Sequence, residues 1–194
     1  QVGLDSPDIT EILSLAQEGA HPAGEASGTV EPCSYRKDYA ARLRKTIQEG
    51  VQAQDYDHPL AGFHIVVDAG NGAGGFYATE VLEPLGADVS GSQFLEPDGM
   101  FPNHVPNPEN QEAMASICQA VQAAGADLGV IFDTDVDRGA AVDSLGEEIS
   151  RNRLVALASA IALEGNPGGT IVTDSITSDG LKEYIEETLG GHHH

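Results

Sequence analysis

The sequence contains no tryptophan, and aromatic residues make up only 5% of its 194 positions. Its two cysteines, Cys33 and Cys118, have neither metal-ligand nor redox spacing, so we interpret them as reduced residues of a cytosol-like compartment. The chain is 40% hydrophobic, with 23 glycines, and is long enough to bury one core. This composition is typical of an α/β protein built from Ala, Val, Ile and Leu, with glycine-rich turns at strand ends.

Long apolar runs are also missing, since none reaches the roughly 18 residues that a membrane-spanning helix needs. The start of the sequence has no basic stretch followed by an apolar one, so nothing there resembles a signal peptide. The sequence begins with Gln1 rather than methionine. We therefore expect a chain that is mature, trimmed or cut from a longer protein.

Basic residues are scarce: 9 Lys and Arg stand against 31 Asp and Glu, which gives a formal net charge of −22. Such a field repels phosphate backbones and anionic lipids, so we expect no nucleic acid and no membrane partner. An anionic substrate would need cations from a metal or from other parts of the protein. Five basic residues gather between Arg36 and Lys45, and we interpret them as the solvated face of a helix.

Hydrophobic periodicity and turn residues predict alternating helices and strands. Helices are expected from Ser6 onward and at 35–52, 76–85, 110–124, 151–163 and 178–189. Strands are expected at 63–67, 89–94, 128–132 and 170–173, with a hairpin or tight turn joining 140–143 to 148–149. Residues 19–32 are rich in Gly, Ala, Glu, Ser and Pro and predict a linker.

This order of elements predicts an α/β fold in three parts. Residues 1–34 form a helix and a linker, and residues 35–149 form a three-layer domain with a mixed sheet and flanking helices. Residues 150–194 open a second, similar domain with one helix–strand–helix step, and one strand cannot build a parallel sheet. The closing Gly-Gly-His-His-His fits a shortened purification tag and native sequence equally well.

The strongest chemical motif follows the apolar strand at 128–132, where Asp133, Asp135 and Asp137 alternate and Arg138 comes next. The carboxyl end of such a strand is where open α/β folds bind ligands. Three carboxylates on a tight loop repel one another unless they converge on a hard cation, and oxygen ligands suit Mg²⁺. The motif therefore predicts a magnesium site, with Arg138 placed for a phosphate contact.

Other interpretations of this motif remain. A solvated acidic turn is the simplest. An EF-hand fails, because Arg138 stands at its glycine position, Ser144 at its closing glutamate, and the loop follows a strand. A phosphatase that forms an aspartyl-phosphate stays open, with Asp133 as nucleophile and Asp135 as acid/base. Its lysine would have to be Lys182, which is predicted to lie within a helix.

Two further segments invite a functional interpretation. Residues 70–75 satisfy G-x-G-x-x-G after a strand, but no acidic residue ends the next strand, so we favour tight packing over dinucleotide binding. Residues 96–109 form a proline-rich loop that holds polar side chains outward. His104 in this loop is either a catalytic residue or a surface residue, and a lone histidine in a loop is more often at the surface.

Three ordered motifs resemble the second domain of the α-D-phosphohexomutases, the phosphoglucomutase/phosphomannomutase superfamily. Within this superfamily the resemblance is closest to plant-type and algal members. They are V-D-A-G-N-G at 67–72, F-P-N-H at 101–104 with P-N-P at 106–108, and D-T-D-V-D-R at 133–138. Asn152-Arg153 and T-D-S-I-T-S at 173–178 look like the start of the third domain. Residues 1–34 would then be the end of the first. The family usually has glycine where Thr134 stands, a change that we expect the loop to accept.

The resemblance implies a four-domain enzyme that interconverts hexose 1-phosphate and hexose 6-phosphate. A phosphoserine of the first domain would transfer its phosphoryl group by way of a hexose 1,6-bisphosphate. Asp133, Asp135 and Asp137 stand at the family's Mg²⁺ positions, and Arg138 stands where an arginine lies near the transferring phosphate. The expected partners are these sugar phosphates and the remaining domains, and the expected location is the cytoplasm or the plastid stroma.

Several of the family's motifs do not occur in these 194 residues. They are the Thr-Ala-Ser-His loop that carries the phosphoserine, the sugar-selecting Glu-x-Ser-Gly-His type loop and the Ser/Thr-Gly-rich phosphate clamp. We therefore expect a metal-binding fragment of a phosphohexomutase that is inactive alone. Its sugar, whether glucose, mannose or glucosamine, is not encoded here. A self-sufficient Mg²⁺-dependent phosphatase and a non-catalytic acidic α/β binding module are the alternatives.

Overall fold

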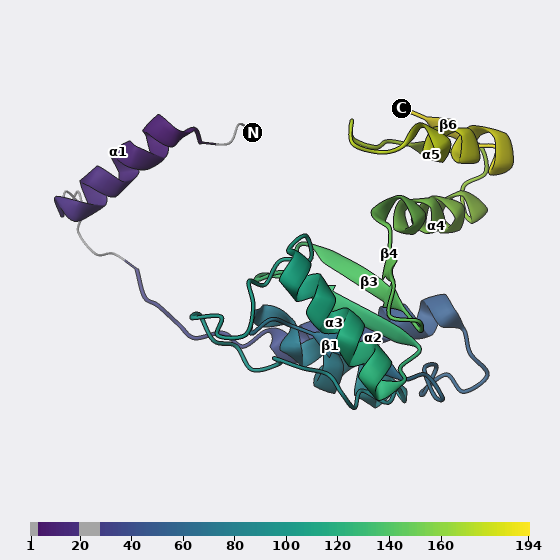
Figure 1. Ribbon diagram of the computed structural model, residues 1–194, viewed down its shortest axis with the longest axis horizontal. Helices are drawn as coiled ribbons and strands as arrows, with labels where there is room; N and C mark the ends of the chain where they lie inside the picture. Colours follow the sequence, from purple (N-terminus) through teal and green to yellow (C-terminus); the bar gives the residue numbers. More distant parts are fainter. Residues whose placement is uncertain (1–3, 20–27) are drawn as a thin grey trace. The chain divides into compact units, whose positions relative to one another are not determined.

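The computed structural model describes residues 4–19 and 28–194 (Figure 1). The chain divides into two compact units between Ser34 and Tyr35, and each unit is described by itself. No helix among the described residues is both long and apolar enough to cross a membrane. Most of the linker predicted at 19–32 lies outside the described residues. The predicted boundaries at 34/35 and 149/150 stay predictions of domain structure.

In the described residues of the first unit, one helix is present, α1 (Ser6–Gln17). Its N-cap is Asp5, because the Asp5 carboxylate accepts from the Asp8 backbone N–H while the Asp8 carboxylate accepts from the Asp5 N–H. Pro7 then lies in the first turn, where no hydrogen-bonded N–H is needed. The apolar residues of α1 are all exposed within this unit.

The second unit is built on a four-stranded mixed sheet in the order β1-β2-β3-β4. The strands are β1 (Ile65–Asp68), β2 (Leu128–Phe132), β3 (Gly139–Asp143) and β4 (Glu148–Ile149). β1 and β2 are parallel, so their carboxyl ends meet at one edge, where Asp68 pairs with Ile131. β2, β3 and β4 are antiparallel neighbours, which confirms the predicted hairpin.

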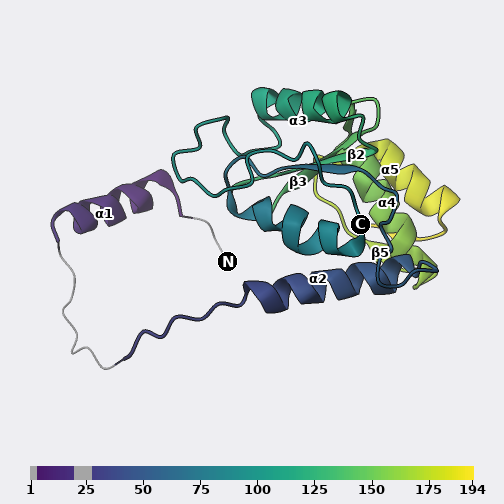
Figure 2. The same cartoon turned by 90° about the horizontal axis from the view of Figure 1, so that it is seen from below.

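Helix α3 (Gln111–Ala124) covers one face of this sheet (Figure 2). It begins and ends where the sequence predicts: the Asn110 side chain accepts from two backbone N–H groups of the first turn, and Gly125 takes the left-handed conformation at φ 63°. Its Ile117 and Val121 pack against Val66 and Val142 in the main core. Each such side chain stabilises the fold by roughly 1.5–3 kcal/mol through burial.

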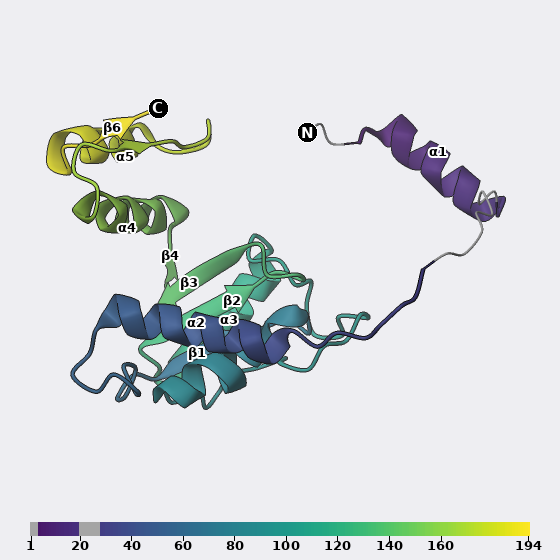
Figure 3. The same cartoon turned by 180° about the vertical axis from the view of Figure 1, so that it is seen from behind.

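The other face is covered by a helical segment, and α2 (Arg36–Val51) lies outside it (Figures 2 and 3). Ala40 of α2 packs against Val81 and Leu85 in a second core. Residues 76–85 were predicted as one α-helix, but the segment changes winding twice. It consists of η1 (Ala73–Gly75), a π-helical η2 (Tyr77–Leu82) and a 3₁₀ turn η3 (Glu83–Leu85). Pro84 has no N–H for an α-helical bond, and Gly86 ends the segment at φ 93°.

The strand predicted at 89–94 is not formed as a continuous ladder. One isolated bridge joins it to β1, Asp68 with Gln93, and a second bridge pairs the residues just before each segment, His64 with Asp88. Between these bridges Gly91 adopts φ 83°, and the Ser92 hydroxyl takes the Val67 N–H at 2.9 Å in place of a backbone carbonyl. The prediction was wrong because a turn in the middle of the segment interrupts the pairing.

The last part of the chain forms α4 (Arg151–Glu164), β5 (Thr170–Ile171), α5 (Asp179–Glu183), η4 (Tyr184–Thr188) and β6 (His192–His193). The predicted helix–strand–helix order is confirmed. In addition, β5 pairs in parallel with β6, so that Ile171 lies opposite His193. Leu163, Leu181 and Ile185 form a small core between the helices. The terminal histidines therefore act as a strand in this fold.

Candidate metal centre

The predicted metal ligands lie on the loop between β2 and β3, here called the aspartate loop (residues 133–138). The antiparallel register pairs Phe132 with Gly139, so the loop closes directly after β2. The Asp133 N–H donates to the Arg138 carbonyl at 3.1 Å across its base. Val136 at the tip adopts φ 67°, which turns the chain back toward β3. The loop stands at the carboxyl edge shared by β1 and β2.

Asp133, Asp135 and Asp137 converge in this loop. One carboxylate oxygen from each lies within 4.8 Å of the other two. Asp133 is buried, with 1% of its surface exposed, whereas Asp135 and Asp137 face solvent. Such a set of hard oxygen donors, closed on one side by protein and open on the other, fits Mg²⁺, which keeps several water ligands.

Arg138 surrounds Asp133 from two directions. Its backbone N–H donates to Asp133 Oδ1 at 3.1 Å, and its side-chain Nε donates to Asp133 Oδ2 at 3.0 Å. The same Nε lies 3.5 Å from Asp137 Oδ1. One terminal nitrogen of the guanidinium lies 3.4 Å from Asn107 Oδ1, on the loop before α3. Arg138 therefore links the acidic loop to the proline-rich loop.

These contacts shift the pKa values of Asp133 and Asp137 in opposite directions. Burial opposes ionisation of Asp133, but the Arg138 N–H, a hydrogen bond with Asp137 and the Arg138 guanidinium outweigh it and hold the Asp133 pKa below its usual value. The pKa of Asp137 is raised, first by the hydrogen bond with Asp133 and then by the charges of Asp133 and Asp135. The loop thus concentrates negative charge at Asp133, where a cation or a guanidinium can neutralise it.

The glycine-rich segment at 70–75 supports the aspartate loop from below. The Ala73 N–H donates to the Thr134 carbonyl at 2.8 Å. A Cβ on Gly72 would stand 2.7 Å from that same oxygen, so only glycine allows the two loops to approach this closely. Gly74 leaves room in the same way for the Phe132 ring. The glycines serve packing, as the sequence indicated, but they do so chiefly between two loops.

His104 lies where the sequence did not place it. The residue is buried, with 8% of its surface exposed, rather than at the surface. Its Nε2 lies 3.0 Å from both carboxylate oxygens of Asp68, the last residue of β1. Asp68 itself is fully buried and was not singled out from the sequence. The available signal was its position at the end of a buried strand, directly before the glycine-rich turn.

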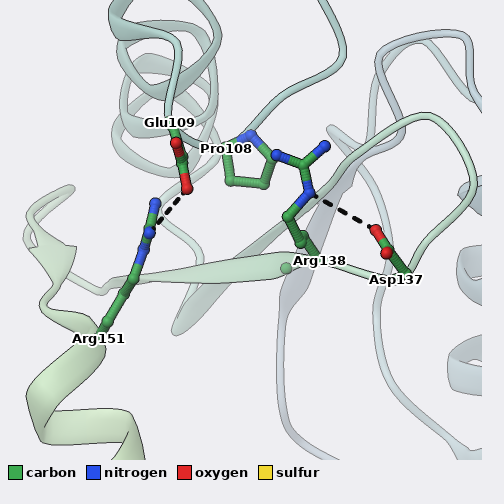
Figure 4. Close-up of a pocket in the computed structure, with 6 residues that line it drawn as sticks. Pro108, Glu109, Asp137, Arg138 and Arg151 are labelled. Carbon is green, nitrogen blue, oxygen red and sulfur yellow. Dashed lines mark hydrogen bonds and ion pairs between the residues drawn. The ribbon is translucent and has the colours of Figure 1, made fainter. Parts of the chain in front are cut away.

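A cavity of about 270 Å³ lies beside the aspartate loop (Figure 4). Two arginines line it, Arg138 from the loop and Arg151 from the first turn of α4. Arg151 donates to the Glu109 carboxylate at 2.8 Å, and Pro108 lies between the two arginines. The sequence analysis did not single out Arg151, because its partner Glu109 is remote in the chain.

The family described as "Phosphoglucomutase/phosphomannomutase, alpha/beta/alpha domain II" matches residues 37–146. The chain belongs to this family. The match includes strands β1 to β3, α3, the glycine-rich segment and the whole aspartate loop. The resemblance and the α/β fold class inferred from the sequence are confirmed, while the likeness to plant and algal members stays a prediction.

Individual relatives of the family agree. The chain is 41% identical over 126 residues to a phosphomannomutase/phosphoglucomutase of Pseudomonas syringae, covering 65% of this chain and 27% of the relative. It is 31% identical over 182 residues to a phosphoglucomutase of Neisseria gonorrhoeae, covering 94% of this chain and 37% of the relative. A solved phosphoglucomutase/phosphomannomutase family protein of Burkholderia thailandensis is 27% identical with a TM-score of 0.74, over 98% of this chain and 38% of that one.

The matches cover a larger share of this chain than of the proteins that it matches. Nearly all of the present chain is accounted for, but it spans only about a quarter to two fifths of the lengths of the proteins that it matches. Fold and family therefore follow directly for this chain.

Proposed function

We propose that this chain is the metal-binding part of a phosphohexomutase. In the whole enzyme, hexose 1-phosphate and hexose 6-phosphate would interconvert by way of a phosphoserine and a hexose 1,6-bisphosphate. The observation that carries the proposal is the convergence of Asp133, Asp135 and Asp137 beside Arg138, in a chain of this family. This arrangement supplies a cation site and a guanidinium at one edge of a sheet.

In this proposal the three aspartates hold Mg²⁺. When bound, the ion supplies positive charge that stabilises a transferring phosphoryl group. Asp133 is the fixed member of the set, because its two oxygens already accept hydrogen bonds from Arg138. Asp135 and Asp137 are exposed and complete the set from the solvent side.

Arg138 would bind the phosphate from beside the metal. Desolvation lowers the pKa of its guanidinium, but the charges and hydrogen bonds of Asp133 and Asp137 together outweigh it and raise this pKa, so the side chain stays cationic. Its Nε is held by Asp133, and the side chain lines the cavity described above. A guanidinium fixed in this way favours phosphate oxygens through directed, charge-assisted hydrogen bonds.

The phosphatase alternative is disfavoured by the family match, because the matching family and the relatives described above are phosphoglucomutases and phosphomannomutases. The lysine required by this mechanism would have to be Lys182, which lies on α5 in the last part of the chain. The family match also disfavours a non-catalytic binding module.

An activity assay tests the proposal. The chain is incubated with glucose 1-phosphate, Mg²⁺ and a trace of glucose 1,6-bisphosphate, and glucose 6-phosphate and inorganic phosphate are both measured. We expect neither product from this chain alone, since the phosphoserine motif is not among its residues. In a full-length phosphohexomutase carrying this segment, Asp135→Asn should reduce isomerisation by on the order of 100-fold, because charge stabilisation at the phosphoryl group is lost.

Two results would contradict the proposal. Isomerisation by the 194-residue chain alone would show that the missing motifs are not needed. Phosphate release that disappears in Asp133→Asn would instead identify a phosphatase.

A further inference from the structure

The Asp68–His104 pair is a buried polar contact that the proposed chemistry does not use. The two side chains are 0% and 4% exposed, and His104 Nε2 lies 3.0 Å from both Asp68 oxygens. The His104 ring also packs edge-on against Phe94, with ring centroids 5.4 Å apart. A buried carboxylate is costly unless it is fully hydrogen-bonded, so this pair is a fixed part of the structure.

Polar contacts surround the pair on both sides. Asp68 accepts from the Gly70 N–H at 2.9 Å and from Gln93 Nε2 at 2.7 Å, in addition to its contact with His104. On the far side of the ring, His104 Nδ1 lies 3.0 Å from the Val105 carbonyl oxygen. Each ring nitrogen therefore faces an oxygen of the protein. His104 thus joins a strand-end carboxylate to a backbone carbonyl.

The glycine-rich segment connects this pair to the aspartate loop. A Cβ on Gly70 would stand 2.9 Å from His104 Cε1, so the ring rests directly on this segment. The segment continues to Ala73, whose N–H donates to the Thr134 carbonyl at 2.8 Å. Thr134 lies between the first two proposed ligands. The position of the His104 ring is therefore linked, through the glycine-rich segment, to the position of the Thr134 carbonyl.

Residues 105–107 form a second connection between the pair and the aspartate loop. The Val105 carbonyl that meets His104 Nδ1 also accepts the Asn107 N–H at 2.8 Å. This turn holds the Asn107 side chain, whose Oδ1 lies 3.4 Å from an Arg138 terminal nitrogen. The ring thus helps to fix the residue that contacts the guanidinium.

We propose that His104, held by Asp68, is a positioning residue of the metal centre. Its hydrogen-bond contacts are with Asp68 and Val105, and none of them reaches the proposed metal ligands. It fixes the two segments that hold the aspartate loop, one at Thr134 and one at Arg138. The effect on metal affinity rests on the proposed function, whereas the effect on the loop does not.

The test compares three variants of the 194-residue chain. His104→Leu removes both hydrogen bonds of the ring, and His104→Gln retains an amide N–H that can reach Asp68. His58→Leu is the matched control, because His58 Nδ1 also faces an aspartate, Asp55, at 3.3 Å but both side chains are exposed. Amide hydrogen exchange by NMR is measured at Ala73 and Arg138, and at Gly129 and Ile131 of β2 for comparison. Mg²⁺ affinity is measured by titration.

We expect His104→Leu to accelerate exchange at Ala73 and Arg138 about tenfold or more while the β2 amides change little. Mg²⁺ binding should weaken by about tenfold, in the range found when residues that orient metal ligands are removed. His104→Gln should recover part of both effects, and His58→Leu should match the unmodified chain.

Three outcomes would overturn the inference. Unchanged exchange at Ala73 and Arg138 in His104→Leu would exclude a positioning role. Equal acceleration at the β2 amides would show a general structural role instead. Unchanged Mg²⁺ affinity despite faster exchange would show that the position of the loop does not affect metal binding. If the unmodified chain gave no Mg²⁺ response, the proposed function would fail, and the exchange rates would still decide the positioning of the loop.

Discussion

Asp133 differs from the other two aspartates of its loop in its surroundings. It is buried and accepts two hydrogen bonds from Arg138, whereas Asp135 and Asp137 are exposed. Its pKa is lowered despite its burial, and that of Asp137 is raised. The three side chains are therefore not equivalent. Asp133 anchors the loop to Arg138, and the exposed pair leaves access for a cation from solvent.

Glycine positions give a sharp test of the packing at single residues. A Cβ at Gly75 would stand 1.8 Å from the Leu95 carbonyl oxygen, a backbone atom that cannot move aside cheaply. Gly75→Ala should lower the free energy of unfolding by about 3 kcal/mol, as overpacking in a tight core does. Gly50 in α2 has open space around its Cβ position, so Gly50→Ala should raise stability by about 0.5 kcal/mol.

Chemical denaturation of the two variants measures both effects. Equal stability of Gly75→Ala and the unmodified chain would contradict the close approach of the glycine-rich segment to residue 95.

Single residues differ in how far the sequence reveals them. The convergence of the three aspartates could be predicted because they alternate within a few positions after one strand, so local spacing carries the information. His104 could not be placed in this way, since its partner Asp68 lies 36 positions away. Arg151 and Glu109 are likewise remote, at 42 positions. Such pairs depend on the fold that brings them together.

Helix α2 and the π-helical segment η2 form the outer layer of the second unit. Arg36 pairs with Glu80 at 2.9 Å, and an Arg44 guanidinium nitrogen donates to the Glu80 carbonyl. The Tyr39 and Tyr77 hydroxyls lie 3.1 Å apart. The basic cluster at 36–45 was interpreted from the sequence as a solvated face. Arg36 fits that interpretation, since its side chain is 66% exposed, whereas Arg44 departs from it, because its half-buried side chain contacts a neighbouring element.

The contact between these two helices should weaken at high pH. Burial, followed by the hydrogen bond and the charge of Tyr39, raises the pKa of Tyr77 to about 12. A raised pKa means that folding favours the protonated phenol, so its contribution is complete below the usual value of about 10 and is lost as pH rises through about 12. Tyr77→Phe should reduce this alkaline loss of stability, because it removes the ionising hydroxyl.

Thermal unfolding across the alkaline range, with tyrosine absorbance followed in parallel, checks this expectation. An identical alkaline decline in Tyr77→Phe would place the cause elsewhere.

Elements followed the sequence where their ends carry strong local signals. Asn110 and Gly125 bound α3 as predicted, because a side-chain cap and a left-handed glycine act within one turn. The segments at 76–85 and 89–94 departed from prediction for the opposite reason. Their apolar periodicity was sound, but Pro84 and Gly91 impose local geometry that periodicity does not describe.

At the scale of the whole molecule, charge and family point in one direction. The chain carries a net charge of −22 and spans 37% of the length of a relative that matches nearly all of it. We propose that Mg²⁺ and basic groups from the rest of a phosphohexomutase offset this charge around a sugar phosphate. The family and fold could be predicted from three ordered motifs. The choice of sugar could not, because no sugar-selecting motif of the family occurs in these residues.

The central claim is that Asp133, Asp135 and Asp137 bind Mg²⁺, and an NMR titration tests it most directly. Asp135→Asn removes one exposed ligand, and Asp57→Asn changes an exposed carboxylate outside the loop. We predict saturable amide shift changes centred on residues 133–138, the same response in Asp57→Asn, and at least about tenfold weaker binding in Asp135→Asn. No response at these amides, or an equal response in Asp135→Asn, would contradict the account.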